Sequence, residues 1–110
     1  MKENQTVKID LIYDETCPNF EAARVVLKLA LDELGIHHEW KEWNRSEGSS
    51  PKFIQQYGSP TILVNGKDVA GIGPQSEMNC CRLYEDSAGR LKKVPPVEQV
   101  LKAILKAKEL

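Results

Sequence analysis

Apolar and polar positions in the first half of the chain follow strand-like and helix-like spacing in turn. Residues 7–13 are β-branched and apolar and stop at polar residues 14–16, which predicts a buried strand. From Phe20 to Leu34 apolar residues recur every three or four positions, which predicts an amphipathic helix ending at Gly35. Residues 36–43 alternate loosely and favour a second strand, with Trp40 and Trp43 on opposite faces.

The pattern in the second half of the chain predicts a short helix, a hairpin and a final helix. Residues 51–57 predict a short helix, capped by Ser49 or Ser50 and closed by Gly58. Residues 61–64 form a strand, and Asn65-Gly66 predicts a tight hairpin with a return strand over 67–72. Residues 82–85 and 90–94 flank a turn, so they either pair or form a loop. Apolar spacing over 96–107 predicts a last amphipathic helix.

The predicted order β-α-β-α-β-β-α defines an α/β fold with a mixed four-stranded sheet flanked by helices. The βαβ half is parallel because a crossover helix joins its strands, and the hairpin half is antiparallel. A chain of 110 residues supports one domain, 1–110, with a frayed N-terminus over 1–6 and an irregular insertion over 74–95.

Composition and charge narrow the classes of function. Fifteen Lys and Arg against sixteen Asp and Glu give a net charge of −1, which argues against a nucleic-acid partner. The chain contains no run of 18 apolar residues, which argues against a membrane span, and its start lacks a signal-peptide apolar region. We therefore expect a cytoplasmic location, where three cysteines are structural, catalytic or metal-binding rather than a disulfide scaffold.

Cys17 is the first candidate for chemistry, because it stands between a predicted strand and the start of a predicted helix. Unpaired N–H groups and the positive end of the helix dipole favour the thiolate, which is the nucleophilic form. Asp14 and Glu15 oppose this effect if they point the same way. The alternative is a small buried hydrophobic residue, the usual role of a free cysteine.

The strand, Cys17-Pro18-Asn19-Phe20 and the following helix resemble the active-site corner of the thioredoxin and glutaredoxin superfamily. Residues 58–66, with sequence GSPTILVNG, are similar to that superfamily's cis-proline loop and hairpin. The resemblance implies a thioredoxin-like fold, Cys17 as the N-terminal active-site cysteine, and a cis-proline at Pro60. With its neighbours Ser59 and Thr61, Pro60 would contact the substrate.

Phe20 departs from the thioredoxin pattern, which has a second cysteine at that position. A local Cys-x-x-Cys disulfide is therefore impossible. Monothiol glutaredoxins also lack the second cysteine, so the resemblance remains compatible with glutathione chemistry.

Cys80 and Cys81 are the second candidates, because the return strand of the thioredoxin-like fold leads back toward the active-site end of the sheet. Either residue could then meet Cys17 as a resolving thiol in a nonlocal disulfide. All three could alternatively be ligands of a soft metal. A third reading is a coincidental pair of structural cysteines.

A narrower resemblance links Cys17-Pro18, residues 59–68, Cys81-Arg82-Leu83-Tyr84 and residues 89–95 to small bacterial thioredoxin-like proteins associated with organomercurial lyase. It implies thiol handling of a soft electrophile, as in metal resistance, without lyase activity. The expected function is thiol–disulfide redox or thiol transfer, as in a thioredoxin- or glutaredoxin-like oxidoreductase. Its partner would be a thiol or disulfide protein or a small thiol such as glutathione, without a resident cofactor or metal. The alternatives are a soft-metal thiolate binding protein and a noncatalytic interaction module.

Overall fold

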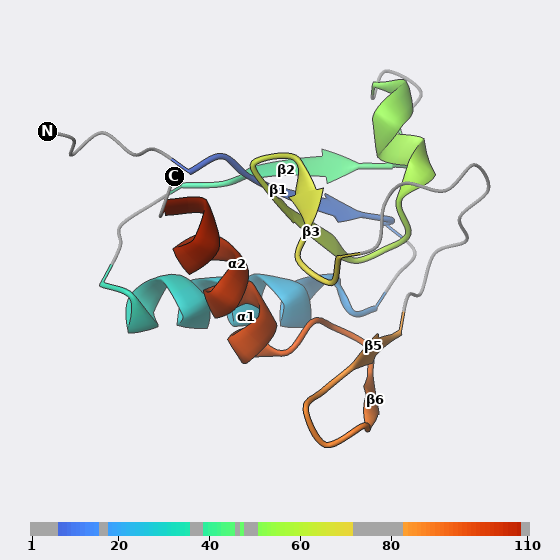
Figure 1. Cartoon of the computed structure of the whole chain (residues 1–110). Helices are drawn as coiled ribbons and strands as arrows, with labels where there is room; N and C mark the ends of the chain where they lie inside the picture. Colours follow the sequence, from blue (N-terminus) through green and yellow to red (C-terminus); the bar gives the residue numbers. More distant parts are fainter. Residues whose placement is uncertain are drawn as a thin grey trace, which may run out of the picture.

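A four-stranded mixed sheet forms the centre of the protein (Figure 1), as the sequence predicted. The computed structural model describes residues 7–15, 18–35, 39–45, 47, 51–71 and 83–108. The strands are β1 (Ile9–Tyr13), β2 (Lys41–Asn44), β3 (Thr61–Val64) and β4 (Lys67–Asp68), and they lie in the order β2-β1-β3-β4. β1 is parallel to β2 and antiparallel to β3, and β3 is antiparallel to β4.

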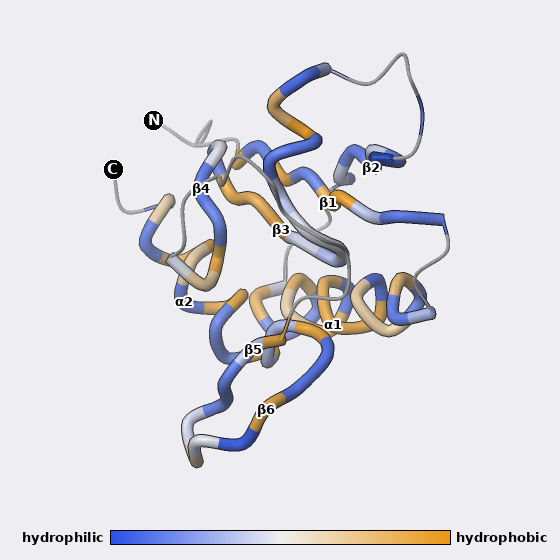
Figure 2. Tube along the Cα trace, turned by 90° about the vertical axis from the view of Figure 1, so that its right-hand side faces the viewer, coloured by the Kyte–Doolittle hydropathy of each residue, from blue (hydrophilic) through white to orange (hydrophobic). Residues whose placement is uncertain are grey.

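The central strand β1 sends alternate side chains to two separate cores. Ile9 and Leu11 face α1 (Phe20–Glu33) and α2 (Val97–Lys108), whereas Ile12 faces the opposite side of the sheet. All four residues of β3 are buried, since both faces of that strand are covered. In Figure 2 hydrophobic positions are concentrated along β1, β3 and α1, and the turn between β5 (Tyr84–Glu85) and β6 (Leu91–Lys92) is hydrophilic.

The two α-helices pack against each other and cover one face of the sheet. The buried positions follow helical spacing: Ala23, Leu27, Ala30 and Leu31 on α1, with Val100 and Ile104 on α2. The predicted end of α1 is confirmed, because Leu34 is the C-cap and Gly35 has a positive φ of 68°.

The predicted second helix is a 3₁₀ helix, η1 (Lys52–Gln56), so the described residues contain two α-helices rather than three. Pro51 occupies the N-cap without a side-chain cap, in place of the predicted serines 49 and 50, which lie outside the described residues. The segment is short because Pro51 and Tyr57 at its two ends are both extended. Its length is typical of 3₁₀ helices, which rarely propagate. Ile54 and Tyr57 anchor it against Ile12 in the second core.

The predicted hairpin after β3 is confirmed, with positive φ at both Asn65 and Gly66. Its return strand is shorter than predicted and ends at Asp68 rather than residue 72. The Asp68 carboxylate accepts the Ala70 N–H at 3.0 Å, and the Asp68 carbonyl accepts the Gly71 N–H at 2.8 Å. These bonds form a turn in place of further strand, and residue 72 lies outside the described part of the chain.

Residues 84–92 form a hairpin in which β5 and β6 pair antiparallel, so the pairing interpretation of this segment was right. The described part of the predicted irregular insertion, 83–95, thus contains regular structure.

Of the strand predicted over 36–43, the described residues form β2 from Lys41, with Trp40 just before it, and residues 36–38 lie outside the described part of the chain. Trp40 packs against the helix-side core and Trp43 against the η1-side core, as their spacing predicted. In the described parts of the chain no helix has the length and apolar character needed to cross a membrane.

Candidate functional site

The three cysteines predicted to carry chemistry, Cys17, Cys80 and Cys81, lie outside the described residues. Their convergence therefore stays a prediction. The described residues nevertheless define the edge of the sheet at which β1 ends and β3 begins. That edge includes Ser59, Pro60 and Thr61, the three predicted substrate-contacting residues.

The segment before β3 is fastened to the end of β1. The Asp14 N–H donates to Ser59 Oγ at 2.9 Å, across 45 residues of sequence. The antiparallel register that pairs Ile12 with Thr61 places the start of β3 there. The Ser59–Pro60 peptide bond is cis, as the resemblance implied. The structure thus brings Ser59 beside Asp14, three residues before Cys17 in sequence.

Ser59, Pro60 and Thr61 are fully buried. Thr61 Oγ1 donates to the Gly58 carbonyl at 2.7 Å, and the Tyr84 hydroxyl donates to the Pro60 carbonyl. These residues support the edge from within, and contact between them and a substrate stays a prediction. The sequence did not predict the contact of Tyr84 with Pro60, because Tyr84 is 24 residues away and belongs to a separate small sheet.

Arg45 holds the other side of the same edge. Its Nη1 lies 3.3 Å from Asp14 Oδ2, and the two side chains are only 13% and 15% exposed. The Arg45 backbone N–H donates to the Tyr13 carbonyl at 2.7 Å. Its Nη2 donates to the Gln55 carbonyl at 3.4 Å, and the Gln55 side chain donates to the Arg45 carbonyl.

The strand register explains why Asp14 and Arg45 meet. Tyr13 and Asn44 are register partners at the ends of two parallel strands, and Asp14 and Arg45 are the next residues along. Opposite charges directly after neighbouring parallel strands meet at one edge. The positive charge of Arg45 compensates the negative charge of the Asp14 carboxylate. Glu15 remains exposed, and the Asn44 side-chain amide donates to its carboxylate at 3.3 Å.

Phe20, the first residue of α1, joins the start of α1 to the end of β1. Its ring stacks on Tyr13 with centroids 3.9 Å apart and an interplanar angle of 14°. The Arg24 guanidinium lies 4.2 Å from the Phe20 centroid. At the N-cap, Asn19 makes no side-chain hydrogen bond to the first turn of α1.

Arg24 ties α1 to β2 through a bidentate contact. Its Nη2 and Nε donate to the two Glu42 carboxylate oxygens at 2.7 and 2.8 Å, and Trp40 Nε1 donates to Glu42 at 3.0 Å. The hydrogen bonds from Arg24 hold the pKa of Glu42 below its usual value, and Glu42 raises the pKa of Arg24. Arg24 also pairs with Glu21 at 3.1 Å. The Arg24 guanidinium is therefore paired with the carboxylates of Glu42 and Glu21 rather than with a thiolate.

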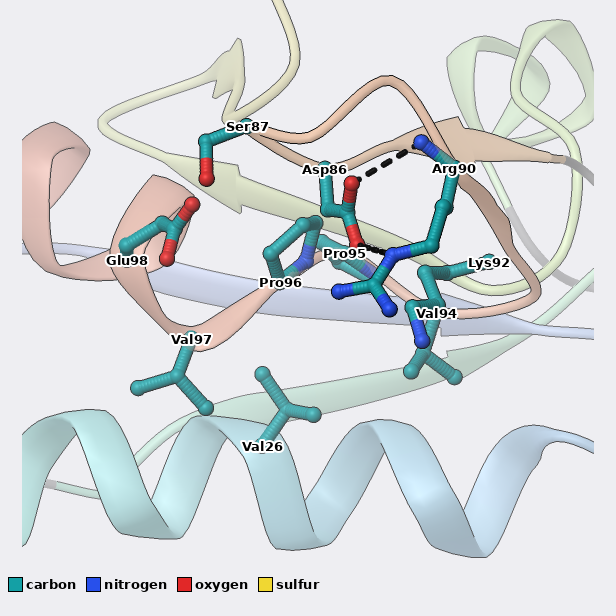
Figure 3. A pocket seen from close by; sticks show the side chains of 10 residues that line it. All are labelled: Val26, Asp86, Ser87, Arg90, Lys92, Val94, Pro95, Pro96, Val97 and Glu98. Atoms are coloured by element: carbon teal, nitrogen blue, oxygen red, sulfur yellow. Dashed lines mark hydrogen bonds and ion pairs between the residues drawn. The ribbon is translucent and has the colours of Figure 1, made fainter.

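A groove of about 330 Å³ lies between the β5–β6 hairpin, α1 and the start of α2 (Figure 3). Val26 of α1 and Val97 of α2 face each other across it, and Arg90 is bonded to Asp86 on the hairpin side. Its lining includes none of the edge residues Asp14, Arg45, Ser59 and Pro60. It is therefore separate from the candidate site.

The described residues contain no group of three His, Cys, Asp or Glu side chains placed to hold a metal ion. This does not test the soft-metal alternative, because its ligands Cys17, Cys80 and Cys81 are not among those residues. No protein-family model matches the chain, and no curated protein matches it significantly.

Proposed function

We propose that the protein is a thioredoxin-like thiol–disulfide exchange protein with Cys17 as its nucleophile. The observation that carries the proposal is the hydrogen bond from the Asp14 N–H to Ser59 Oγ. It fastens the segment containing Pro60 to the strand end that leads into Cys17. This is the juxtaposition that the resemblance to thioredoxins and glutaredoxins requires.

The sheet supports the same fold assignment. β1 lies between a parallel β2 and an antiparallel β3, and a crossover helix joins β1 to β2. α1 and α2 cover one face of the sheet. η1 lies on the other face, in the place of the second predicted helix. A thioredoxin-like domain requires this strand order and these strand directions.

The proposed reaction is two successive thiol–disulfide exchanges. The Cys17 thiolate attacks one sulfur of a partner disulfide, forming a mixed disulfide and releasing the other sulfur as a thiolate that takes up a proton. A thiolate of Cys80 or Cys81 then attacks Cys17 Sγ. The partner leaves with two thiols, and the protein retains a nonlocal disulfide.

Two described features favour the Cys17 thiolate. The first turn of α1 receives no side-chain cap from Asn19, and its N–H groups and dipole stabilise a nearby anion. Arg45 neutralises Asp14, the acidic side chain three residues before Cys17.

The Tyr84–Pro60 hydrogen bond brings the described chain back to this edge three residues after Cys81, which supports a resolving role for Cys80 or Cys81. The cytoplasm, a reducing compartment, and a small thiol such as glutathione as partner belong to the same proposal.

Trapping of the mixed disulfide tests the proposed function. Reduced protein is mixed with one equivalent of a small aromatic disulfide whose released thiol is coloured, and adducts are mapped by mass spectrometry. The wild-type protein should release two thiols per chain and form a disulfide between Cys17 and Cys80 or Cys81. A variant with Cys80→Ser and Cys81→Ser should release one thiol and keep the adduct on Cys17.

Cys17→Ser is the matched control and should release thiol at least tenfold more slowly. If Cys17 reacts no faster than in urea-unfolded protein, or if Cys17→Ser leaves the rate unchanged, the proposal is wrong.

A further inference from the structure

We propose that the groove between the β5–β6 hairpin and the two α-helices binds a small organic anion, in which a carboxylate is joined to an apolar body. Each residue that lines this groove belongs to the described part of the chain. None of them belongs to the sheet edge described above, so the inference goes beyond the proposed function and does not depend on it. The groove volume of about 330 Å³ is at the lower end of the range for small-molecule sites, about 300–1,000 Å³.

The floor of the groove is apolar. Val26 of α1 and Val97 of α2 face each other there, and Val94, Pro95 and Pro96 lie beside them (Figure 3). The three valines pack on the helix-side core and remain half-exposed. Apolar ligand atoms placed against them displace water from that surface, which favours binding. The two prolines have no backbone N–H, so this wall offers a ligand no main-chain donor.

Arg90 and Lys92 of the hairpin place two positive charges at one end of the groove. Arg90 Nε donates to Asp86 Oδ2 at 3.3 Å, whereas Arg90 Nη1 and Nη2 have no hydrogen-bond partner among the described residues. Figure 3 shows the guanidinium extending over the groove. A guanidinium with two available N–H groups forms paired hydrogen bonds with a carboxylate. This end of the groove therefore fits the anionic group of a ligand.

Asp86 lines the groove as well, but its negative charge is already compensated. Its carboxylate accepts the backbone N–H groups of Arg90 and Ala88, both at 2.9 Å, and the Nε of Arg90. The backbone hydrogen bond from Arg90 is the main reason that the pKa of Asp86 is lowered, so the carboxylate stays ionised and orients the guanidinium. Ser87 and Glu98 lie at the other end of the groove (Figure 3), where the charge of Glu98 disfavours an anion. The ligand carboxylate is therefore assigned to the Arg90 end.

Three probes with the same apolar body test the inference. They are 4-phenylbutyrate, 4-phenylbutan-1-ol and 4-phenylbutylamine, which carry a negative charge, no charge and a positive charge. Each probe is titrated at low salt into nitrogen-15-labelled full-length protein, with a phosphine reductant to keep the cysteines reduced. The backbone amide shifts are followed by NMR.

The butyrate should shift the backbone amides of Val26, Arg90 and Val97, with a dissociation constant of about 1–10 mM, as expected for so small a ligand. It should bind about two- to fivefold more tightly than the alcohol, because the ion pair with Arg90 is exposed. The amine should bind no more tightly than the alcohol. The amides of Asp14 and Arg45, at the sheet edge, should not shift.

Arg90→Met should abolish the preference for the butyrate over the alcohol. Its matched control is Lys28→Met, which removes a positive charge from an exposed ion pair on α1 and should keep that preference. Val26→Ala should weaken the binding of the butyrate and the alcohol by about two- to fivefold. Val25→Ala is its control, because Val25 is the adjacent residue, is 56% exposed and does not line the groove, and it should leave both affinities unchanged.

The inference is overturned if the three probes bind equally, if Arg90→Met keeps the preference, or if the shifted amides lie outside the groove. A preference for the amine would also contradict it, because Glu98 would then determine which charge the groove accepts. The charge series on the wild-type protein needs no substitution, so it decides the question even where a variant does not fold.

Discussion

At the scale of single residues, a few hydrogen bonds between residues far apart in sequence determine how the sheet edge is built. Trp43 Nε1 donates to the buried Asp10 carboxylate at 2.9 Å, and Tyr84 donates to the Pro60 carbonyl. Each bond satisfies an acceptor that burial removes from water. An acceptor left unpaired in such a place costs about 1–3 kcal/mol. Removing one such donor should therefore lower the free energy of unfolding of the whole domain.

Tyr84→Phe tests the most buried of these donors at constant packing. Tyr84 is 2% exposed, and the variant keeps the ring but leaves the Pro60 carbonyl without this donor. The free energy of unfolding should fall by about 1–2 kcal/mol, measured by urea titration. Tyr13→Phe is the control, because among the described residues its hydroxyl has no hydrogen-bond partner, and it should change stability by less than about 0.5 kcal/mol. Equal effects of the two variants would contradict the assigned role.

At the scale of elements, the Arg24–Glu42 contact joins α1 to the edge strand β2 across 18 residues. Arg24 also covers Phe20, which stacks on Tyr13, so the contact fixes both ends of the connection between β1 and α1. The contact depends on ionised Glu42. Stability should therefore depend on pH through this carboxylate.

The sign of that dependence follows from the lowered pKa of Glu42. The folded protein binds the Glu42 proton less readily than the unfolded chain does. The stabilisation is therefore full above the ordinary pKa of about 4.5 and is lost as pH falls through the lower folded value. Relative to Glu42→Gln, the wild type should be more stable at pH 6 by about 1 kcal/mol or less, because the pair is partly exposed. This advantage should shrink toward pH 3, as measured by urea titration at both pH values.

Glu33→Gln is the control for this comparison, since Glu33 is an exposed carboxylate at the end of α1 without an ion pair among the described residues. Its difference from wild type should be near zero at both pH values. An advantage over Glu42→Gln that grew toward acid would contradict the argument.

Elements that depend on local sequence patterns were predictable from the sequence, whereas the long-range contacts between them were not. The β-branched, apolar run over 7–13 and the Asn65-Gly66 turn specify β1 and the hairpin, since each depends on neighbouring residues alone. The burial of Ile54 of η1 in a second core is not revealed by local spacing. Of the candidate site, the sequence indicated Pro60 and its cis bond but not Arg45 or Tyr84, whose roles arise from strand register and a separate hairpin.

At the scale of the whole molecule, one sheet separates two cores of unequal size. The helix-side core includes residues of β1, β3, α1 and α2, whereas the η1-side core contains Ile12, Ile54, Tyr57 and Leu63. Both cores share β1 and β3, whose alternating residues belong to each in turn. A strand cannot leave one core and remain in the other, so we expect the two cores to unfold together.

The two tryptophans report on the two cores separately. Trp40→Phe leaves Trp43 against the η1-side core, and Trp43→Phe leaves Trp40 against the helix-side core. With Ile54→Ala added to each, both fluorescence transitions in urea should shift together, with a loss of about 2–5 kcal/mol. The matched control is Phe53→Ala, an adjacent, 43% exposed residue with a smaller expected loss. A shift confined to the Trp43 signal would contradict a single cooperative unit.

The short edge strands β2 and β4 affect whether copies of the protein can pair through their β-sheets. β4 has two residues and β2 has four, and these are the two edges of the described sheet. An exposed edge can recruit a strand from another molecule, and its capacity to do so grows with its length and flatness. Here β4 gives way to a turn after Asp68, and β2 begins with an exposed lysine whose ammonium lies 4.4 Å from the Trp43 ring. The two edges of the described sheet therefore offer little backbone for pairing with a strand of another molecule, so we expect the native protein to resist edge-to-edge aggregation.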